Sequence, residues 1–559
     1  MRIPTGPASP RRRLLGAGGL VTAAALALVG CSSGSTPTDG SSSTAPVEAR
    51  DELVVATSSL PSTFNYDGGT GSGAENEELS RNTMVALIKN VVEVNPTSGL
   101  LEQNLYEFEG ELAESYEVSA DGLVYTFHLR DDVLSQEGNP LDADDVLWSY
   151  ERKWLAPAAT NKNLNSPVIT DPLAQFQKID DLTVSVTIAT AGQGHLLLSL
   201  MANNTGYIYD SDLLKEHVTA EDPYAVQWSM ENANHGFGAY TVESFTPGQE
   251  MILAANPNWY GGELPIQTVT YRVVADPGTR ANMVKSGDAD IAQSVRPVDR
   301  ADLAEAEGVK VYDFAFTNLL VSLGMLTERA PLDDQTVREA FAYAVPYQSI
   351  IDNVYMGAAS RRVGFLSPTL PGYSEDSYPD YTYDPEKALE LLAEAGVSTP
   401  VAFTLTVPNW LPDLEDAAVQ IQSYAADAGF DVAINKVSLA DYNAGGPAAT
   451  FDAMLRRNYA IVQSPTYVLN LLFNPNNGHT RWVSPAYQAI IAEANAQDDA
   501  LAPETVDLWL EAEALRMEEM PLAVIAAVPQ LNAFLADVQG HVNRSDNAIQ
   551  FSNLFIGTE

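Results

Sequence analysis

Cysteine is nearly absent from this sequence, which contains only Cys31 among its 559 residues. A single thiol cannot form a disulfide within the chain, so the fold must be stabilised by its hydrophobic core. Zinc sites built from cysteines are excluded as well, and the six histidines include no HExxH motif and no pair four residues apart. The sequence therefore predicts neither a dedicated metal site nor a cofactor.

Motifs for catalysis and phosphate binding are missing too. GxSxG and GxxxxGKS/T do not occur, and the glycine-rich segment 69–73 lacks the pattern of a dinucleotide-binding loop. The acidic pairs Asp144–Asp145 and Asp333–Asp334 stand at expected helix starts, where negative charge complements the helix dipole. Glycosidase-type acids need no local motif, so the residues alone leave a secreted hydrolase open.

Positive charge is scarce, with 30 lysines and arginines against 74 aspartates and glutamates and a formal net charge of −44. This balance argues against a nucleic-acid partner and against lying flat on anionic lipid. Long apolar runs are missing after the first thirty residues, so no later segment is expected to span a membrane. The chain is too long for one hydrophobic core, and at least two lobes are expected.

What is present begins with a leader. Residues 1–30 contain four arginines and no acidic residue, followed by a short apolar stretch, which is typical of a secretory signal peptide. Leu28–Cys31 resembles the bacterial lipobox, in which the cysteine becomes the lipidated first residue of the mature chain. We therefore expect Cys31 to anchor the protein; the alternative is a chance cysteine. Segment 11–15 also resembles a twin-arginine signal, which leaves the export route open.

Residues 31–50 are rich in Ser, Thr, Gly and Pro and cannot bury enough apolar surface to order themselves. They are predicted to form a flexible leash. Beyond the leash, apolar strands alternate with helices that begin at Asp-type caps. The clearest caps are Asp142 with Asp145 three residues on, Asp276 before Pro277, and Asp384 before Pro385. The pattern indicates an α/β protein of several lobes.

Several segments, in chain order, carry a resemblance to a known family. Segment 111–152 (ELAESYEV…DADDVLWSYER) resembles the signature region of the peptide/nickel-type solute-binding proteins of ATP-driven importers, solute-binding protein family 5. The segments 256–292, 331–368 and 383–396 resemble later blocks of the same family.

The resemblance implies a two-lobed, periplasmic-binding-protein-like fold of type II, cluster C, with an additional third domain and hinge closure around a ligand. Domain I is expected at 51–75, 205–312 and 524–559, domain II at 76–204 and domain III at 313–523. The strand-like runs 311–317 and 522–529 are expected to connect the lobes.

The resemblance also implies a function. The chain is expected to be a lipid-anchored, extracytoplasmic receptor, not an enzyme, that binds an oligopeptide-like solute. Its expected partners are an ABC permease and ATPase subunits and, through the lipid anchor, the cell membrane; a monomer is expected. A non-peptide solute such as an oligosaccharide is the first alternative, and a stand-alone sensor is another.

Peptide-binding relatives carry an aspartate that pairs with the ligand's ammonium group, and alignment on Pro465 puts Ile461 in its place. An apolar side chain cannot neutralise a buried ammonium, so the usual recognition of a free amine is in doubt. The resemblance further suggests Arg456 or Arg457 for a ligand carboxylate, or else two solvated arginines, and Tyr459 as a pocket wall. The remaining candidates for ligand contact are Asn203, Asn204, Thr205, Tyr207 and Trp410, with turn formation or core packing as the alternatives.

Overall fold

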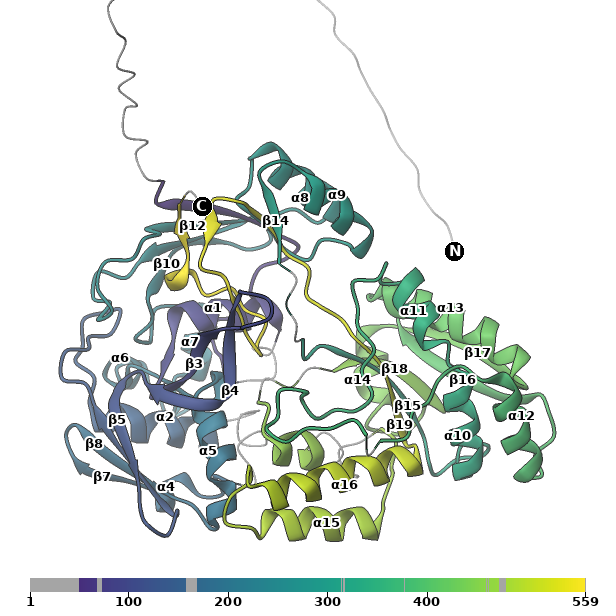
Figure 1. Cartoon of the computed structure of the whole chain (residues 1–559). Coiled ribbons are helices and arrows are strands. Elements are labelled where there is room, and N and C mark those ends of the chain that lie inside the picture. Colours follow the sequence, from purple (N-terminus) through teal and green to yellow (C-terminus); the bar gives the residue numbers. More distant parts are fainter. Residues whose placement is uncertain are drawn as a thin grey trace, which may run out of the picture. The chain divides into compact units, whose positions relative to one another are not determined.

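The computed structural model describes residues 50–67, 73–156, 168–312, 314, 317–376, 378–458, 460, 462–471 and 479–557 (Figure 1). The expected signal peptide, Cys31 and all of the leash but Arg50 lie outside these residues. Among the residues described, no helix combines the length and the apolar character needed to cross a membrane.

Three strands of the first sheet run parallel and therefore end at one edge. β1 (Glu52–Thr57) pairs in parallel with β12 (Thr268–Val273) and with β13 (Ile291–Ala292). The seven-stranded sheet has the order β10-β11-β12-β1-β13-β20-β14. Its other strands are β10 (Tyr240–Thr246), β11 (Glu250–Ala255), β14 (Val309–Val311) and β20 (Ala533–Leu535), and α1 (Ala74–Thr83), α8 (Pro277–Ser286) and α9 (Arg300–Glu305) pack against it.

A second, antiparallel sheet of four strands has the order β5-β6-β8-β7. In β6 (Val124–Leu129) buried and half-buried residues alternate, as expected of a strand with one face toward the core. The other strands are β5 (Ala113–Val118), β7 (Phe176–Asp180) and β8 (Thr183–Thr187), with helices α2 (Ala143–Leu155), α4 (Pro172–Gln175) and α5 (Gly194–Met201).

Smaller elements join the first two sheets. A three-stranded sheet has the order β22-β4-β3, in which β22 (Val542–Asn543) and β3 (Ile88–Val94) flank β4 (Leu101–Gly110). The C-terminal segment thus pairs with residues far back in the chain. The remaining elements of this part are β2 (Val85–Ala86), β9 (Tyr207–Ile208), β21 (Val538–Gln539), β23 (Phe555–Ile556), α6 (Ser211–Lys215) and α7 (Val226–Glu231).

The third large sheet has five strands in the order β17-β16-β18-β15-β19. These are β15 (Leu320–Met325), β16 (Val401–Pro408), β17 (Phe430–Val437), β18 (Ala453–Asn458) and β19 (Leu522–Ala527); the helices are α10 (Gln335–Tyr343), α11 (Tyr347–Asn353), α12 (Pro385–Glu394), α13 (Pro412–Asp427), α14 (Leu439–Gly445), α15 (Pro485–Asn495) and α16 (Pro503–Glu519).

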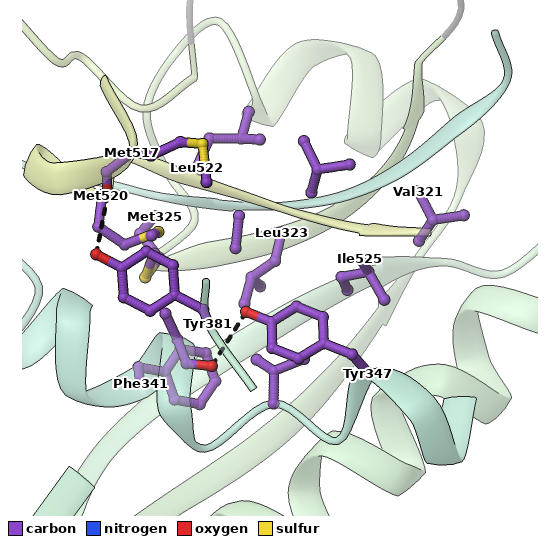
Figure 2. Close-up of a cluster of buried hydrophobic side chains, with 14 of the residues drawn as sticks. Val321, Leu323, Met325, Phe341, Tyr347, Tyr381, Met517, Met520, Leu522 and Ile525 are labelled. Carbon is purple, nitrogen blue, oxygen red and sulfur yellow. Dashed lines mark hydrogen bonds between the residues drawn. The ribbon is translucent and has the colours of Figure 1, made fainter. Parts of the chain in front are cut away.

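Figure 2 shows part of the core beneath this sheet. The hydroxyl of Tyr347 donates to the carbonyl of Ala342 (3.0 Å) and that of Tyr381 to the carbonyl of Met517 (3.2 Å). Each tyrosine thus buries its ring while its polar end stays paired, which avoids the cost of an unsatisfied hydroxyl.

Two segments connect the seven-stranded and the five-stranded sheets, and they run side by side. β14 pairs antiparallel with β20, and further along the amide of Val528 donates to the carbonyl of Leu319 (2.8 Å). Residues 522–527 were expected to belong to the second connection; they form β19 instead, all six buried against β15, so this connection starts at Val528.

The predicted helix starts are confirmed. Asp142 accepts from the amides of Asp144 (2.8 Å) and Asp145 (3.2 Å), and Asp145 accepts from the amide of Asp142 (3.0 Å), which completes a capping box. Asp276 and Asp384, each followed by proline, cap α8 and α12 by accepting from the amides of Thr279 (2.7 Å) and Lys387 (2.9 Å). The acidic pair at 144–145 therefore serves helix formation.

We predict that Asp142→Ala lowers the free energy of unfolding by about 1 kcal/mol, because two amides of the first turn lose their acceptor. Chemical denaturation measures the change. Asp171→Ala is the matched control, since Asp171 precedes α4 without making a side-chain cap bond. Equal effects of the two substitutions would contradict the capping argument.

His235 gives the protein a specific sensitivity to acid. Burial, and secondarily the charge of Arg152, lowers the pKa of His235 to about 4, while the Phe64 carbonyl and Asp67 act in the opposite direction. The unfolded chain takes up this proton near pH 6.5, so below that pH it binds more protons than the folded chain does and stability falls.

We therefore expect the stability of the wild-type protein relative to His235→Phe to fall between pH 6.5 and pH 4, by at most about 1.4 kcal/mol per pH unit. Parallel denaturation curves of both proteins over this range measure the difference. A difference that is constant with pH would show that His235 is not held neutral by its surroundings.

Candidate functional site

A polar hollow lies at the edge where the parallel strands of the seven-stranded sheet end. In open α/β sheets, ligands bind beyond the carboxyl ends of the strands. The hollow has a volume of about 410 Å³, and we call it the β1 hollow. Its lining comprises Thr57, Ser58, Ser59, Leu60, Pro61, Ala74, Glu75, Glu78, Met251, Tyr271, Gln293, Ser294 and Gln530.

Carboxylates and hydroxyls face each other in the β1 hollow. Glu78 is buried and accepts from the hydroxyl of Tyr271 (2.6 Å) and from Nε2 of Gln293 (2.7 and 2.8 Å); burial raises its pKa. Glu75 is half-buried and accepts from the hydroxyl of Ser59. Ser58 and Ser59 are exposed. The hollow therefore offers one buried, hydrogen-bonded carboxylate, one half-buried carboxylate and two exposed hydroxyls.

A second hollow lies beside β18 of the five-stranded sheet, and we call it the β18 hollow. It is smaller, about 270 Å³, and is lined by Asn318, Leu320, Arg362, Phe365, Asn458, Ala460, Gln463 and Val468. Arg362 is 5% exposed and donates to the carbonyls of Gly364 and Leu366. The wall thus combines a buried cation, amides and apolar side chains.

Asn318 joins three distant segments at this hollow. Its Nδ2 donates to the carbonyls of Ala460 (2.8 Å) and Ser545, and its Oδ1 accepts from Nδ2 of Asn547 (3.4 Å). Asn318 lies in the first connecting segment, and Gln530 of the β1 hollow lies in the second. Each hollow therefore includes a residue of a connection between the two sheets.

The two predicted arginines of β18 have different neighbours. Nη1 of Arg456 lies 2.7 Å from Nδ1 of the buried His479, whereas Nη2 of Arg457 forms an ion pair with Asp413 (2.7 Å). Asp413 also accepts from the hydroxyl of Tyr355 (2.8 Å). Neither arginine lines the β18 hollow, whose contribution from β18 is the next residue, Asn458.

The predicted cluster at 203–207 forms a buried turn. Nδ2 of Asn203 donates to the carbonyl of Ser199 (2.7 Å), and the hydroxyl of Thr205 donates to the carbonyl of Leu200 (2.6 Å). Asn204 starts the following 3₁₀ turn, and Tyr207 is buried in β9. These contacts are those of turn formation, and none of the four residues lines either hollow.

The three remaining candidates for ligand contact are Trp410, Tyr459 and Ile461. Trp410 is 39% exposed and packs edge-on against Tyr442, with ring centroids 5.4 Å apart. Tyr459 and Ile461 lie outside the described residues, although their neighbours Asn458 and Ala460 line the β18 hollow. Among the described residues, no group of three or more histidines, cysteines or acids lies close enough to hold a metal ion.

Sequence reasoning missed the β1 hollow. Ser58 and Ser59 directly follow β1, and Gln293 and Ser294 directly follow β13, a two-residue strand that the sequence did not predict. Polar residues after neighbouring parallel strands meet at one edge, but without β13 this neighbourhood was not visible in the sequence. Gln530 gave no signal either, since it approaches the hollow only through the second connection.

Comparison with known proteins identifies the family. The model of the bacterial extracellular solute-binding proteins, family 5 (middle region), matches residues 107–480. The chain belongs to this family.

Two curated relatives and one solved structure illustrate the likeness. The dipeptide-binding protein of Escherichia coli is 25% identical over 80% of this chain and 85% of its own length. The heme-binding protein A of Haemophilus influenzae is 29% identical over 67% of this chain and 68% of its own length. The structure of DppA from Helicobacter pylori in complex with the peptide STSA gives a TM-score of 0.76 at 21% identity, covering 91% of this chain and 99% of that one.

Membership in family 5 agrees with the architecture. The predicted mixed α/β, two-lobed binding-protein fold with an extra domain is confirmed. Proteins of this family are extracytoplasmic transport receptors without catalytic activity. This family-5 chain is therefore a solute-binding receptor, and the hydrolase left open by the residues alone is excluded.

Proposed function

We propose that this family-5 protein is the substrate-binding component of an ABC importer, binds an oligopeptide-like solute and delivers it to a permease powered by separate ATPase subunits. The observation that carries the proposal is the pair of hollows at the ends of β1 and β18, each bordered by a residue of a connecting segment, Gln530 or Asn318. Movement at the connections would change both walls at once, which suits closure around a ligand.

The domain division proposed for this motion follows the sequence except at one boundary. The sequence places domain I at 51–75, 205–312 and 524–559, domain II at 76–204 and domain III at 313–523; because β19 runs from Leu522 to Ala527, we propose to move the last boundary to 527/528. We take the connections at 312–319 and 528–532 as the hinge. The protein is expected to act as a monomer, because both walls of the ligand site come from one chain.

A peptide suits the chemistry of these walls. Serine hydroxyls, amides and a carboxylate in the β1 hollow can pair with peptide N–H and C=O groups irrespective of side chains. Dipeptide-binding relatives and a peptide-bound neighbour support this choice. With Ile461 at the position of the usual aspartate, Glu75 is the carboxylate available for a ligand amine.

A non-peptide solute such as an oligosaccharide is the second candidate. It is favoured by Ile461, which removes the usual partner of a peptide amine, and by the exposed ring of Trp410, on which a sugar can stack. Both candidates use the same hollows and the same receptor role.

Native mass spectrometry of the purified full chain, with the carried ligand released and identified, distinguishes the candidates. We expect a series of peptide masses that shifts to one mass when a single peptide is added in excess. Glycan masses would establish the second candidate. Failure to bind any member of a peptide and glycan panel would overturn both.

We also propose that Cys31 carries the lipid anchor, since it follows a lipobox-like tripeptide and precedes the leash. Cys31→Ser is expected to release the protein from the membrane fraction of producing cells, with Ser32→Ala as the matched control. Retention of the Cys31→Ser protein in membranes would remove the anchor from the proposal.

A further inference from the structure

A third hollow lies away from the β1 and β18 hollows, between α5 and the strands β4, β5 and β6. Its volume is about 810 Å³ and it is open to solvent. The walls include Tyr106 and Phe108 from β4, Tyr116 from β5, Tyr125 from β6, and His195 and Leu198 from α5. We call it the aromatic hollow.

Local structure brings these rings together. Tyr106 and Phe108 share one face of β4 because strand side chains alternate, and His195 and Leu198 are neighbours on α5 because they are three residues apart. The ring of His195 stacks on Tyr106, with centroids 5.5 Å apart and planes at 23°, and lies 5.7 Å from Phe108. Glycine at 194 lets Tyr125 of β6 approach α5, since a Cβ there would lie 1.9 Å from the hydroxyl oxygen of Tyr125.

Polar atoms in this wall are weakly satisfied. Within the described residues, neither ring nitrogen of His195 nor the hydroxyl of Tyr106 makes a hydrogen bond of good geometry, although all three atoms are shielded from solvent; the Leu105 carbonyl is near the imidazole, and Ser367 and Thr369 are near the hydroxyl. Buried polar groups are nearly always paired, so unpaired ones need an explanation. Burial lowers the pKa of His195 to about 4, against the Leu105 carbonyl and Asp499, so its ring is neutral at pH 7 and keeps one donor and one acceptor.

We propose that the aromatic hollow binds a flat aromatic group with a hydrogen-bonding atom on its edge. The ring of the ligand stacks on the tyrosine walls, and rotation of the imidazole about its softly restrained χ2 turns a nitrogen of His195 toward the ligand's edge. A bound metal ion is not the occupant, because His195 has no further ligating residues grouped around it among those described.

Indole is the probe, titrated calorimetrically into the full chain, with cyclohexanol as a non-aromatic control. We expect indole alone to bind. His195→Phe and Tyr106→Phe keep an aromatic ring and remove its polar atoms. If the removed atom bonds the ligand in the wild-type protein, we expect indole to bind about five- to tenfold more weakly, which corresponds to the loss of one net hydrogen bond. Val118 lines the mouth of the hollow and is 45% exposed, so Val118→Trp should block binding without disturbing the core.

Val94→Trp is the matched control, because Val94 is 61% exposed on β3 and does not line the hollow. Absence of indole binding, or equal binding by wild type, His195→Phe and Val118→Trp, would overturn the proposal.

A tryptophan-containing peptide that displaces indole would identify the group as a side chain of the transported solute. Independent binding of indole and peptide would identify a separate small molecule. Indole binding requires no peptide, so the test stands even if the proposed solute is wrong.

Discussion

Asp67→Ala is expected to lower the free energy of unfolding by about 3–5 kcal/mol, because it leaves the guanidinium of Arg152 buried without its carboxylate. The side chains of Arg152 and Asp67 are 0% and 3% exposed and form an ion pair. Arg152 also donates to Oδ1 of Asn65 (3.2 Å) and to the hydroxyl of Ser229 (2.7 Å). These neutral groups satisfy hydrogen bonds but do not offset the charge.

Chemical denaturation of the full chain, followed by circular dichroism, measures the loss. The matched control is Glu390→Ala, which breaks the exposed pair with Lys387 (3.7 Å) and should leave stability unchanged within error. The double variant Asp67→Ala with Arg152→Met removes both charges and should recover part of the loss. A single-variant effect no larger than that of Glu390→Ala would show that water reaches the guanidinium.

Ser58→Trp is expected to weaken binding of the carried ligand by roughly a hundredfold or more. Ser58 is exposed and lines the β1 hollow, so an indole at this position occupies the volume that the ligand needs. A hundredfold loss of affinity corresponds to a binding free energy close to that of about two good hydrogen bonds with the ligand. Calorimetric titration with the ligand released from the native protein measures it.

Ser244→Trp is the control for a tryptophan on an exposed serine of the same sheet, since Ser244 lies on β10 and does not line the hollow. Both variants should unfold at the wild-type denaturant midpoint. Unchanged ligand affinity in Ser58→Trp would mean that the ligand site does not include the β1 hollow, and the proposed closure between the two hollows would then be wrong.

Local sequence patterns were sufficient for the elements of this fold. The caps at Asp142, Asp276 and Asp384 are confirmed because an N-cap is satisfied within four residues and needs no distant partner. The alternation of buried and half-buried residues in β6 is also local, because it follows from the burial of one face of a single strand. Family membership followed from ordered blocks of such local signals.

The candidate site depended on contacts that no local pattern contains. Residues 522–527 were expected to lie in a connection between the lobes. They pair with β15 and form a buried strand instead. Arg456 and Arg457 both lie on β18, but the side chains beside them, His479 and Asp413, come from other segments of the chain. In the turn at 203–207, Asn203 and Thr205 donate to carbonyls of α5, a use of their side chains that the sequence did not indicate.

The sequence alone therefore identified the family and several helix starts, and it predicts an anchor at Cys31, because each of these rests on neighbours within one short segment. Tertiary structure was needed for the β1 hollow, the β18 hollow and the aromatic hollow. Each of these is assembled from segments tens to hundreds of residues apart, and their meeting is set by sheet order and by burial of the whole core, which no single segment specifies.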